Sequence, residues 1–289
     1  MASLRELEND LEIIKSIKDL ATSYQEIATL EMNRIKETVL KTRKFLDGVA
    51  QVYNHAKSAY ISQFRIKSEQ EKEILLKQFP FIKRNGKKIL VFLSANERFY
   101  GGLILIIFNE VLKDLKKGYD LAVVGEIGKR LIQRANISNK TFFFYLDDDH
   151  PTEHQIRTIF QTISQYEKIV VYHGEFETVA LQKPSKTDIS GGIVLGEAPE
   201  EVRQYLFEPS PEAIMEFFEK EIINSLFHQS IFEHQLAKFA SRVITMYQAK
   251  ENAKTLTRKL NQKFKNIKRE IENKKQLNTI SSFRLWKEI

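Results

Sequence analysis

The residue types best suited to hold a metal ion lie in one short acidic run. Asp147–Asp149 and His150 are consecutive, and His154 follows four residues after His150. Carboxylate and imidazole groups are common ligands of divalent ions. Pro151, however, is typical of the first turn of a helix, so we expect a helix to begin between the two histidines, which then share no regular helical face. Acidic side chains are favourable at such a helix start, and we expect no metal ligands in this run.

The segment Gly125–Arg130 is the second pattern that could do chemistry, because it superficially resembles a phosphate-binding loop. Two residues separate its glycines, and Arg130 follows Lys129. A phosphate-binding loop has four residues between its glycines and a Ser or Thr after its lysine. No GxGxxG fingerprint follows any predicted strand either. We therefore expect the chain to bind no nucleotide or other cofactor.

The remaining residues do not indicate nucleophilic catalysis. The chain has no cysteine, and its other histidines show no spacing typical of a metal site or of a nucleophile paired with a base. No Ser/His/Asp arrangement can be assigned. The sequence thus predicts a protein without catalytic residues of its own. Its function then depends on its helices and strands and on the surfaces that they present.

Glycine and proline, which interrupt helices, are confined to the middle of the chain. Sixteen of the seventeen lie between Pro80 and Pro211, and the exception is Gly48. Both ends are therefore predicted to be very long helices, and one from Pro211 to the C-terminus would span roughly 115 Å. We divide the chain into an N-terminal coiled-coil helix (residues 1–79), a central α/β domain (80–208) and a C-terminal coiled-coil helix (209–289).

Apolar residues repeat along both predicted helices with steps of three and four, the spacing of a coiled coil. The predicted seam consists of Leu4, Leu7, Leu11, Ile14, Ile17, Tyr24, Val243, Met246, Leu256, Leu260, Ile267 and Ile271. A central domain of this size cannot cover seams of such length. We therefore expect the two helices to pack on each other as one antiparallel rod.

Short apolar runs alternate with helix-like stretches between the two long helices. Strands are predicted at Ile89–Leu93, Leu121–Val124, Thr141–Leu146 and Ile169–Tyr172, with a hairpin after Gly174 and a short strand near Gly192–Val194. Strand–helix–strand alternation favours a parallel sheet. The predicted fold class is α/β, a Rossmann-like parallel-sheet domain that carries a long antiparallel α-helical coiled coil.

The net charge of +7 is unevenly placed, because the segment from Leu236 to Ile289 holds 14 Lys or Arg against four Glu. A basic helix of this kind can face nucleic acid, anionic lipid, an acidic protein surface or simply solvent. No apolar run approaches the ~18–20 residues needed to span a bilayer, and the opening residues lack the apolar stretch of a signal peptide. We expect no membrane span and a location in the cytoplasm or at the cytoplasmic face of a membrane.

Five stretches, in chain order, resemble one protein family: Met1–Leu7, Ser94–Leu103, Tyr172–Pro184, Phe207–Glu212 and Ser241–Leu256. They are similar to that family's opening residues, its Gly-Gly-Leu turn after the first strand, its strand before a Gln-x-Pro, its entry into the last helix and its run ending Asn-Ala-x-x-Leu. The family is the γ subunit of F-type rotary ATPases, the central shaft of ATP synthase. The resemblance covers the whole chain.

This resemblance implies a non-catalytic rotor shaft in a hexamer of α- and β-type ATPase subunits, coupling ATP synthesis or hydrolysis there to rotation and proton transport. It also implies an ε-like subunit or another partner at the base, and a peripheral location at the cytoplasmic face of the cell membrane. The residues expected to contact the ring lie on the C-terminal helix: Lys254, Arg258, Lys259, Lys265, Lys268, Arg269, Leu277, Phe283 and Trp286.

Two alternatives stay open. The stretches near residues 20–32 and near the C-terminus, where the family's shaft touches its ring, depart from the family pattern. The first alternative is therefore the shaft of a divergent F-type-like ATPase that drives something other than proton flow. The second is a basic coiled-coil protein that binds nucleic acid, although the basic helix lacks the regularly interleaved aromatics on which bases stack. We expect no nucleic-acid partner.

Overall fold

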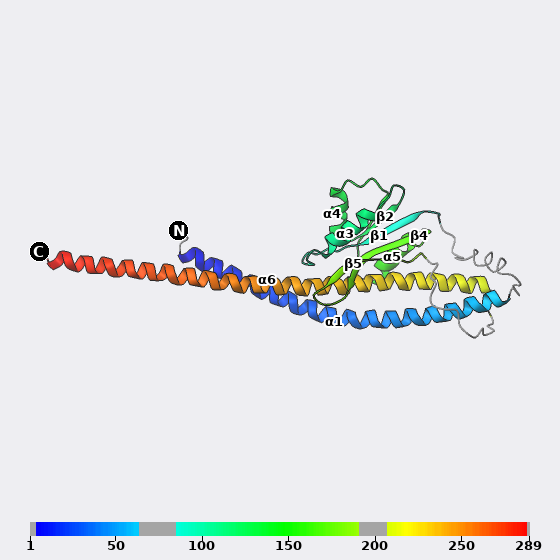
Figure 1. Ribbon diagram of the computed structural model, residues 1–289, viewed down its shortest axis with the longest axis horizontal. Coiled ribbons are helices and arrows are strands. Elements are labelled where there is room, and N and C mark those ends of the chain that lie inside the picture. The colour runs from blue at the N-terminus through cyan, green and yellow to red at the C-terminus, as the bar shows by residue number, and fades with distance from the viewer. Residues whose placement is uncertain (1–3, 64–84, 191–206, 288–289) are drawn as a thin grey trace. The chain divides into compact units, whose positions relative to one another are not determined.

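The computed structural model describes residues 4–63, 85–190 and 207–287, with side chains at 4–60, 85–190 and 207–280 (Figure 1). Its elements are α1 (Leu4–Gln63), β1 (Lys88–Leu93), α3 (Leu103–Asp114), β2 (Asp120–Val124), α4 (Glu126–Arg134), β3 (Thr141–Phe144), α5 (Glu153–Ile163), β4 (Lys168–Phe176), β5 (Gln182–Asp188) and α6 (Pro211–Lys287). The chain divides into two compact units. One is Thr29–Ser241, and the other combines α1 up to Ala28 with α6 from Arg242 onward.

A five-stranded sheet with the order β3-β2-β1-β4-β5 forms the centre of the first unit. β1 pairs in parallel with β2 and β4, β2 pairs in parallel with β3, and β5 returns antiparallel to β4. The register aligns Val91 with Ala122 and Val171, and all three are fully buried. Continuous apolar strands of this kind are typical of a sheet covered on both faces. The expected Rossmann-like parallel domain is confirmed.

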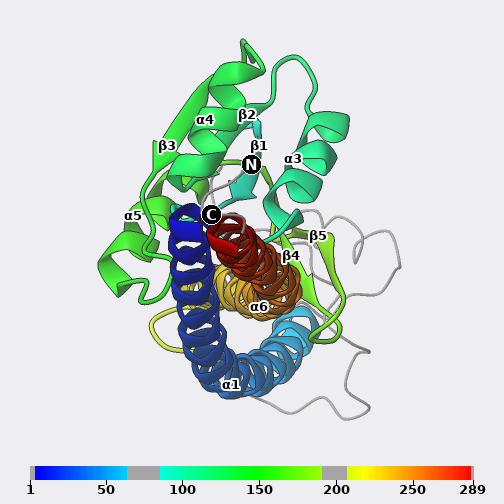
Figure 2. The ribbon, with the colours of Figure 1, turned by 90° about the vertical axis from the view of Figure 1, so that its left-hand side faces the viewer.

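Helices cover both faces of this sheet, because alternate side chains of a strand point to opposite faces. Leu90 and Phe92 of β1 pack with α3 and α4, whereas Val91 packs with α5 and α6 (Figure 2). The α6 residues on this face are Ile223, Phe227 and Ile231. The first half of the C-terminal helix is therefore a layer of the α/β domain.

Three predicted boundaries in this domain were wrong, one of them the end of β4, which was expected at Tyr172 and lies at Phe176. α5 begins at Glu153 rather than at Pro151, because Thr152 is its N-cap and forms a reciprocal capping box with Gln155. β3 ends at Phe144, since its pairing with β2 ends there. The strand expected near residues 192–194 and the limit at residues 79/80 lie outside the described residues.

α1 and α6 run antiparallel within the first unit, and buried polar side chains lie along their contact. The Tyr53 hydroxyl donates to Glu219 at 3.3 Å, and Arg43 pairs with Glu233. A residue later in α1 thus pairs with a residue earlier in α6, as antiparallel helices require. Both glutamates are buried, and a polar contact inside a helix pair specifies which residues face each other.

In the second unit, the start of α1 packs beside the C-terminal half of α6 (Figure 1). The buried positions of α1 in this unit are seven residues apart: Leu7, Ile14, Ala21 and Ala28. The buried apolar positions of α6 in this unit are Val243, Met246 and Ala253. A seven-residue repeat is the period of a coiled coil, so the expected coiled coil is confirmed. Over the described ranges, no helix combines the length and the apolar character needed to cross a bilayer.

Candidate functional site

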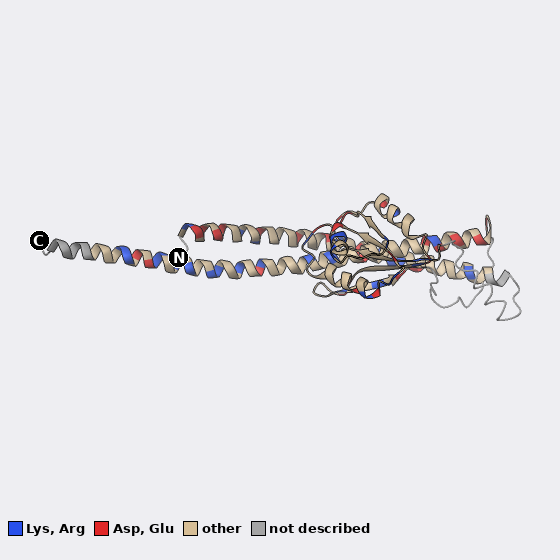
Figure 3. Cartoon of the chain, turned by 90° about the horizontal axis from the view of Figure 1, so that it is seen from above, with Lys and Arg blue, Asp and Glu red and all other residues tan. Residues whose placement is uncertain are grey.

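Six basic residues expected to contact partners lie on the C-terminal half of α6 (Figure 3). Only Lys254 is half-buried, and it pairs with Glu251 at 2.6 Å. The other five are exposed: Arg258, Lys259, Lys265, Lys268 and Arg269. Within the described part of the chain, the last four of these form no ion pair. This stretch of helix therefore presents positive charge that the described residues leave without ion-pair partners.

The last described turns of α6 are exposed on every side. All side chains from Ile271 to Ile280 face solvent, and Leu277 and Ile280 are 63% and 59% exposed. Phe283 and Trp286, the other two residues expected at a partner contact, lie in the part of α6 whose side chains are outside the described set. The described part of the tip thus offers large apolar side chains to water, which is typical of a contact surface.

The residues of the predicted seam divide into three groups. The buried ones are Leu7, Ile14, Val243 and Met246. The half-buried ones are Leu4, Leu11, Leu260 and Ile267. The exposed ones are Ile17, Tyr24, Leu256 and Ile271. The seam was drawn too wide, because a helix in contact with a single neighbour buries one narrow stripe of its surface.

A second stripe on α1 explains the exposed positions there. We call it the apolar stripe: Ile13, Ile17, Leu20, Tyr24 and Ile27. Its steps of four and three residues place these side chains along one face of the helix. Their exposed fractions lie between 39% and 59%. The predicted seam combined residues of this stripe with buried ones, although the regular spacing of the stripe could have separated the two.

The acidic run of residues 147–149 accepts hydrogen bonds from the chain's own backbone. Asp147 Oδ1 accepts hydrogen bonds from the backbone N–H groups of Asp149, at 3.0 Å, and His150, at 2.7 Å. Among the described residues, no group of three His, Cys, Asp or Glu is arranged to hold a metal ion. The run is thus a turn that leads into α5.

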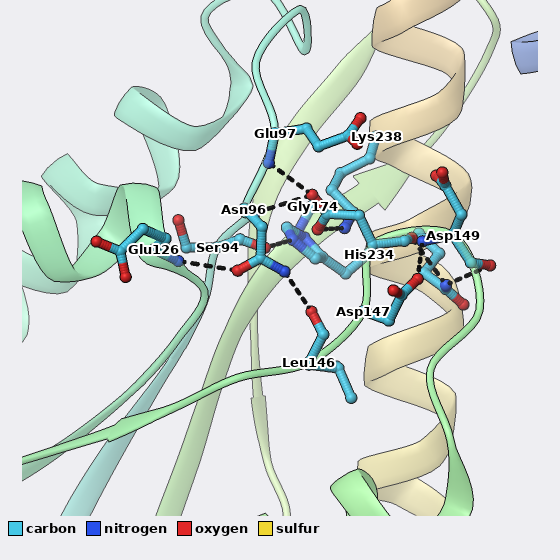
Figure 4. A network of polar contacts seen from close by, with 12 residues as sticks. Ser94, Asn96, Glu97, Glu126, Leu146, Asp147, Asp149, Gly174, His234 and Lys238 are labelled. Carbon is cyan, nitrogen blue, oxygen red and sulfur yellow. Dashed lines mark hydrogen bonds and ion pairs between the residues drawn. The ribbon is translucent and has the colours of Figure 1, made fainter.

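Asp148, in the same run, is buried and joins three parts of the fold. Figure 4 shows its neighbours Asn96, Glu97 and Lys238. Its Oδ2 accepts the backbone N–H groups of Asn96 and Glu97, both at 2.8 Å. Its Oδ1 receives the ammonium of Lys238, from α6, at 2.6 Å. The Asn96 side chain in turn donates to the carbonyl of Leu146 at 2.6 Å. This carboxylate therefore connects the loop after β1 to the C-terminal helix.

The segment Gly125–Arg130 brings α4 close to the end of β1. Gly125 has a φ of 105°, a conformation that favours glycine. A Cβ there would lie 2.8 Å from the backbone nitrogen of Ala95, and one at Gly128 would lie 2.7 Å from the Cβ of Ser94. The glycines therefore serve close packing.

The crevice where the strand order reverses is occupied by a side chain of α6. In open α/β sheets, ligands bind at the carboxyl ends of the strands where the order reverses, here between β1 and β4. His234 Nε2 donates to the carbonyl of Ser94, just beyond β1, at 2.9 Å, and its Nδ1 accepts the N–H of Gly174, in β4, at 3.0 Å. Burial and the nearby Lys238 lower the pKa of His234 well below its ordinary value, so the ring is neutral at pH 7. This role was not predicted from the sequence, where the signal was a His and a Lys four residues apart on the last helix.

Comparison with known proteins places the chain in a family. A family model described as ATP synthase matches residues 3–271. The ATP synthase gamma chain of Dichelobacter nodosus is 20% identical over 281 residues, covering 91% of this chain and 92% of that protein. The gamma chain of Coxiella burnetii (strain Dugway 5J108-111) is 22% identical over 269 residues, covering 88% of each. The chain belongs to the ATP synthase γ-chain family.

Solved structures share the γ-chain fold at low sequence identity. The rotor of Euglena gracilis mitochondrial ATP synthase includes a chain with a TM-score of 0.62 and 14% identity, which covers 93% of this chain and 98% of that one. The central stalk and c-ring structure of Tetrahymena thermophila mitochondrial ATP synthase includes another, with a TM-score of 0.58 and 14% identity, which covers 80% and 99%.

Membership in the γ-chain family confirms two predictions. The chain is a γ-type chain of an ATP synthase, and it is a non-catalytic one. The relatives match along nearly their whole length, so the chain contains the family's long helices and its α/β domain together.

Proposed function

We propose that this γ chain is the rotor shaft of an F-type rotary ATPase, seated in a ring of α- and β-type subunits. Rotation of the shaft couples ATP synthesis or hydrolysis in the ring to proton transport. An ε-like subunit or another partner binds at the base, the chain binds no cofactor of its own, and the assembly lies at the cytoplasmic face of the cell membrane.

The observation that carries this proposal is the apolar stripe of α1. Five large side chains on one helix face are exposed next to a face that is already buried against α6. A continuous apolar surface of this kind on a soluble protein marks a contact with another molecule. A narrow rod with one apolar side is suited to lie inside a close-fitting protein ring.

The basic residues of α6 support the same contact in a different way. Exposed ion pairs contribute only about 0–1 kcal/mol each. Lys259, Lys265, Lys268 and Arg269 have no ion-pair partner among the described residues. Contacts between these residues and acidic loops of a ring would be weak one by one, so they can exchange as the shaft turns. The ring binds the shaft with an affinity that differs between shaft orientations. By linkage, the shaft orientation then changes the affinity of the ring for nucleotide.

The test is co-purification of the full chain with α- and β-type subunits at low salt. We compare a stripe variant, Ile13→Ser with Leu20→Ser and Ile27→Ser, with a matched control, Glu12→Ser with Asp19→Ser and Glu26→Ser. The control positions are also exposed, have the same seven-residue spacing and precede the stripe positions by one residue. We expect the wild-type chain and the control to recover an active ATPase, and the stripe variant to recover at least about tenfold less, a loss of 1.4 kcal/mol or more in binding.

Equal recovery with the stripe variant and the control would refute the role of the stripe. Recovery of nucleic acid without ATPase subunits would reject the shaft and favour a nucleic-acid-binding protein, whose binding would weaken steeply with salt. Recovery of an active ring that lacks proton-transport partners would favour a shaft that drives another load. That alternative is favoured by the departures near residues 20–32 and near the C-terminus and by the low identity to the relatives, 20–22%.

A further inference from the structure

An ion pair of α6 is almost completely shielded from water. The side chains of Lys238 and Asp148 are 4% and 5% exposed, and Nζ lies 2.6 Å from Oδ1. The ammonium also lies 5.3 Å from the ring centre of Tyr100. A buried ion pair adds little net stability compared with an apolar pair of the same size, because both charges lose their hydration. Its contribution here is the geometry that it imposes on the groups around it.

The groups held by this pair belong to the loop between β1 and α3. Asp148 Oδ2 accepts two N–H groups near the start of the loop, those of Asn96 and Glu97. At the other end of the loop, the Ser241 hydroxyl of α6 donates to the carbonyl of Tyr100 at 2.7 Å. Both ends of the loop are therefore connected to the same helix.

The backbone between these two ends has an unusual conformation. Phe99 has a φ of 76° and is 54% exposed. Bulky residues rarely adopt this region, and such a conformation persists only where the surroundings over-determine it. The loop lines a hollow of about 280 Å³ together with Arg130 and Arg134 of α4. A loop shaped in this way must be held firmly from behind.

The helix that holds the loop has little room to shift against the sheet. A methyl group at Gly174 of β4 would lie 2.9 Å from the Cβ of Ala237, which is closer than normal carbon contacts. His234, one turn before Lys238, bonds to backbone groups at the ends of β1 and β4. Sliding or turning α6 here would break these bonds together with the ion pair.

We propose that Lys238 is a positioning residue, which ties the loop of residues 96–100 to α6 through Asp148, so that helix and loop move as one rigid piece. This inference goes beyond the proposed function, which supplies only the reason why a rigid connection between helix and loop is useful. A rotor must pass rotation from its shaft helix to its α/β domain without slipping. Hydrogen bonds have preferred directions and apolar contacts do not, so a polar joint resists twisting in a way that an apolar contact does not.

The experiment is native-state amide hydrogen exchange on the purified full chain, with Lys238→Met compared with Lys220→Met. Methionine keeps the length of the side chain and removes the charge. Lys220 is the matched control, since it lies on the same helix and its pair with Glu216, at 2.6 Å, is exposed. We expect the amides of Asn96 and Glu97 to exchange at least about tenfold faster in Lys238→Met than in the control, while core amides of β2 change less than about twofold.

Uniformly faster exchange in Lys238→Met would show a purely structural role, and unchanged exchange at Asn96 and Glu97 would show that the pair does not hold the loop. Either result overturns the proposal. If Lys238→Met does not fold, Ser241→Ala is the second variant, and it should raise exchange at residues 98–100 several-fold. Unchanged exchange there would also overturn the proposal. Because no partner is present, these results do not depend on whether the chain seats in a ring.

Discussion

Two Gly→Ala substitutions, at Gly174 and Gly48, should change stability in opposite directions. Gly174 lies in β4, where a Cβ would meet the Cβ of Ala237 at 2.9 Å and a methyl group of Leu103 at 3.1 Å. Gly48 lies inside α1, and no atom outside its own helix turn lies within 4 Å of its Cβ position. One added methyl group is therefore excess volume at the first site and a gain in helix propensity at the second.

The magnitudes follow from packing and from backbone entropy. Excess volume in a well-packed core costs about 1–3 kcal/mol, so Gly174→Ala should lower the free energy of unfolding by that amount. Alanine inside a helix is favoured over glycine by about 0.8–1 kcal/mol, so Gly48→Ala should raise it by nearly 1 kcal/mol. The two variants should differ by roughly 2–4 kcal/mol.

Urea unfolding followed by far-ultraviolet circular dichroism measures this difference, and an unchanged slope shows that only stability has changed. The packing argument is refuted if Gly174→Ala is as stable as the wild type. A Gly48→Ala variant that is less stable than the wild type would refute the description of that position as an open helix surface.

Three further predictions concern buried hydrogen bonds, buried histidines and the tip. Tyr53→Phe should destabilise the chain by about 1–3 kcal/mol in urea unfolding, because it removes the donor to the buried Glu219 carboxylate; a loss below about 0.5 kcal/mol would contradict this. Burial lowers the pKa of His173 and His234, so the unfolded chain binds their protons first as pH falls below about 6.5. Stability should then fall by up to about 1.4 kcal/mol per pH unit for each histidine, and a flat profile between about pH 7.5 and 5.5 would refute it. Deleting Leu277–Ile289 should weaken binding to the ring and change the free energy of unfolding by less than about 0.5 kcal/mol, since residues 271–280 are exposed; unaltered ATPase coupling would count against a seated tip.

The long helices and the parallel sheet were predictable because their signals are local. The ends of the chain lack Gly and Pro apart from Gly48, which α1 passes without a break, and the strands are short apolar runs between turn residues. Each signal lies within one element, where chain propensity decides the outcome.

The joint at Lys238 was not predictable from the sequence, because it depends on residues distant along the chain. Lys238 and Asp148 are 90 positions apart, and they meet because α6 and α5, which follows Asp148, cover the same face of the sheet. A lysine on a helix is most often a solvated surface residue.

For a related reason, the sequence did not predict which apolar positions of α1 are buried and which are exposed. A repeat of three and four residues shows that a helix has an apolar side, and it does not show how wide a stripe its neighbour covers. Ile14 is buried and Ile17 is exposed, although both fit the same repeat. The identity of the covering helix decides between them, and that is a property of the tertiary fold.

The antiparallel pairing of α1 with α6 has a consequence for synthesis of the chain on the ribosome. Tyr53 and its partner Glu219 are 166 residues apart. At about 5–20 residues per second, the first helix waits on the order of 10–30 s before the residues that cover it are made. During that interval its apolar side chains are bare, and a molecular chaperone or an early-arriving binding partner would have to shield them from aggregation.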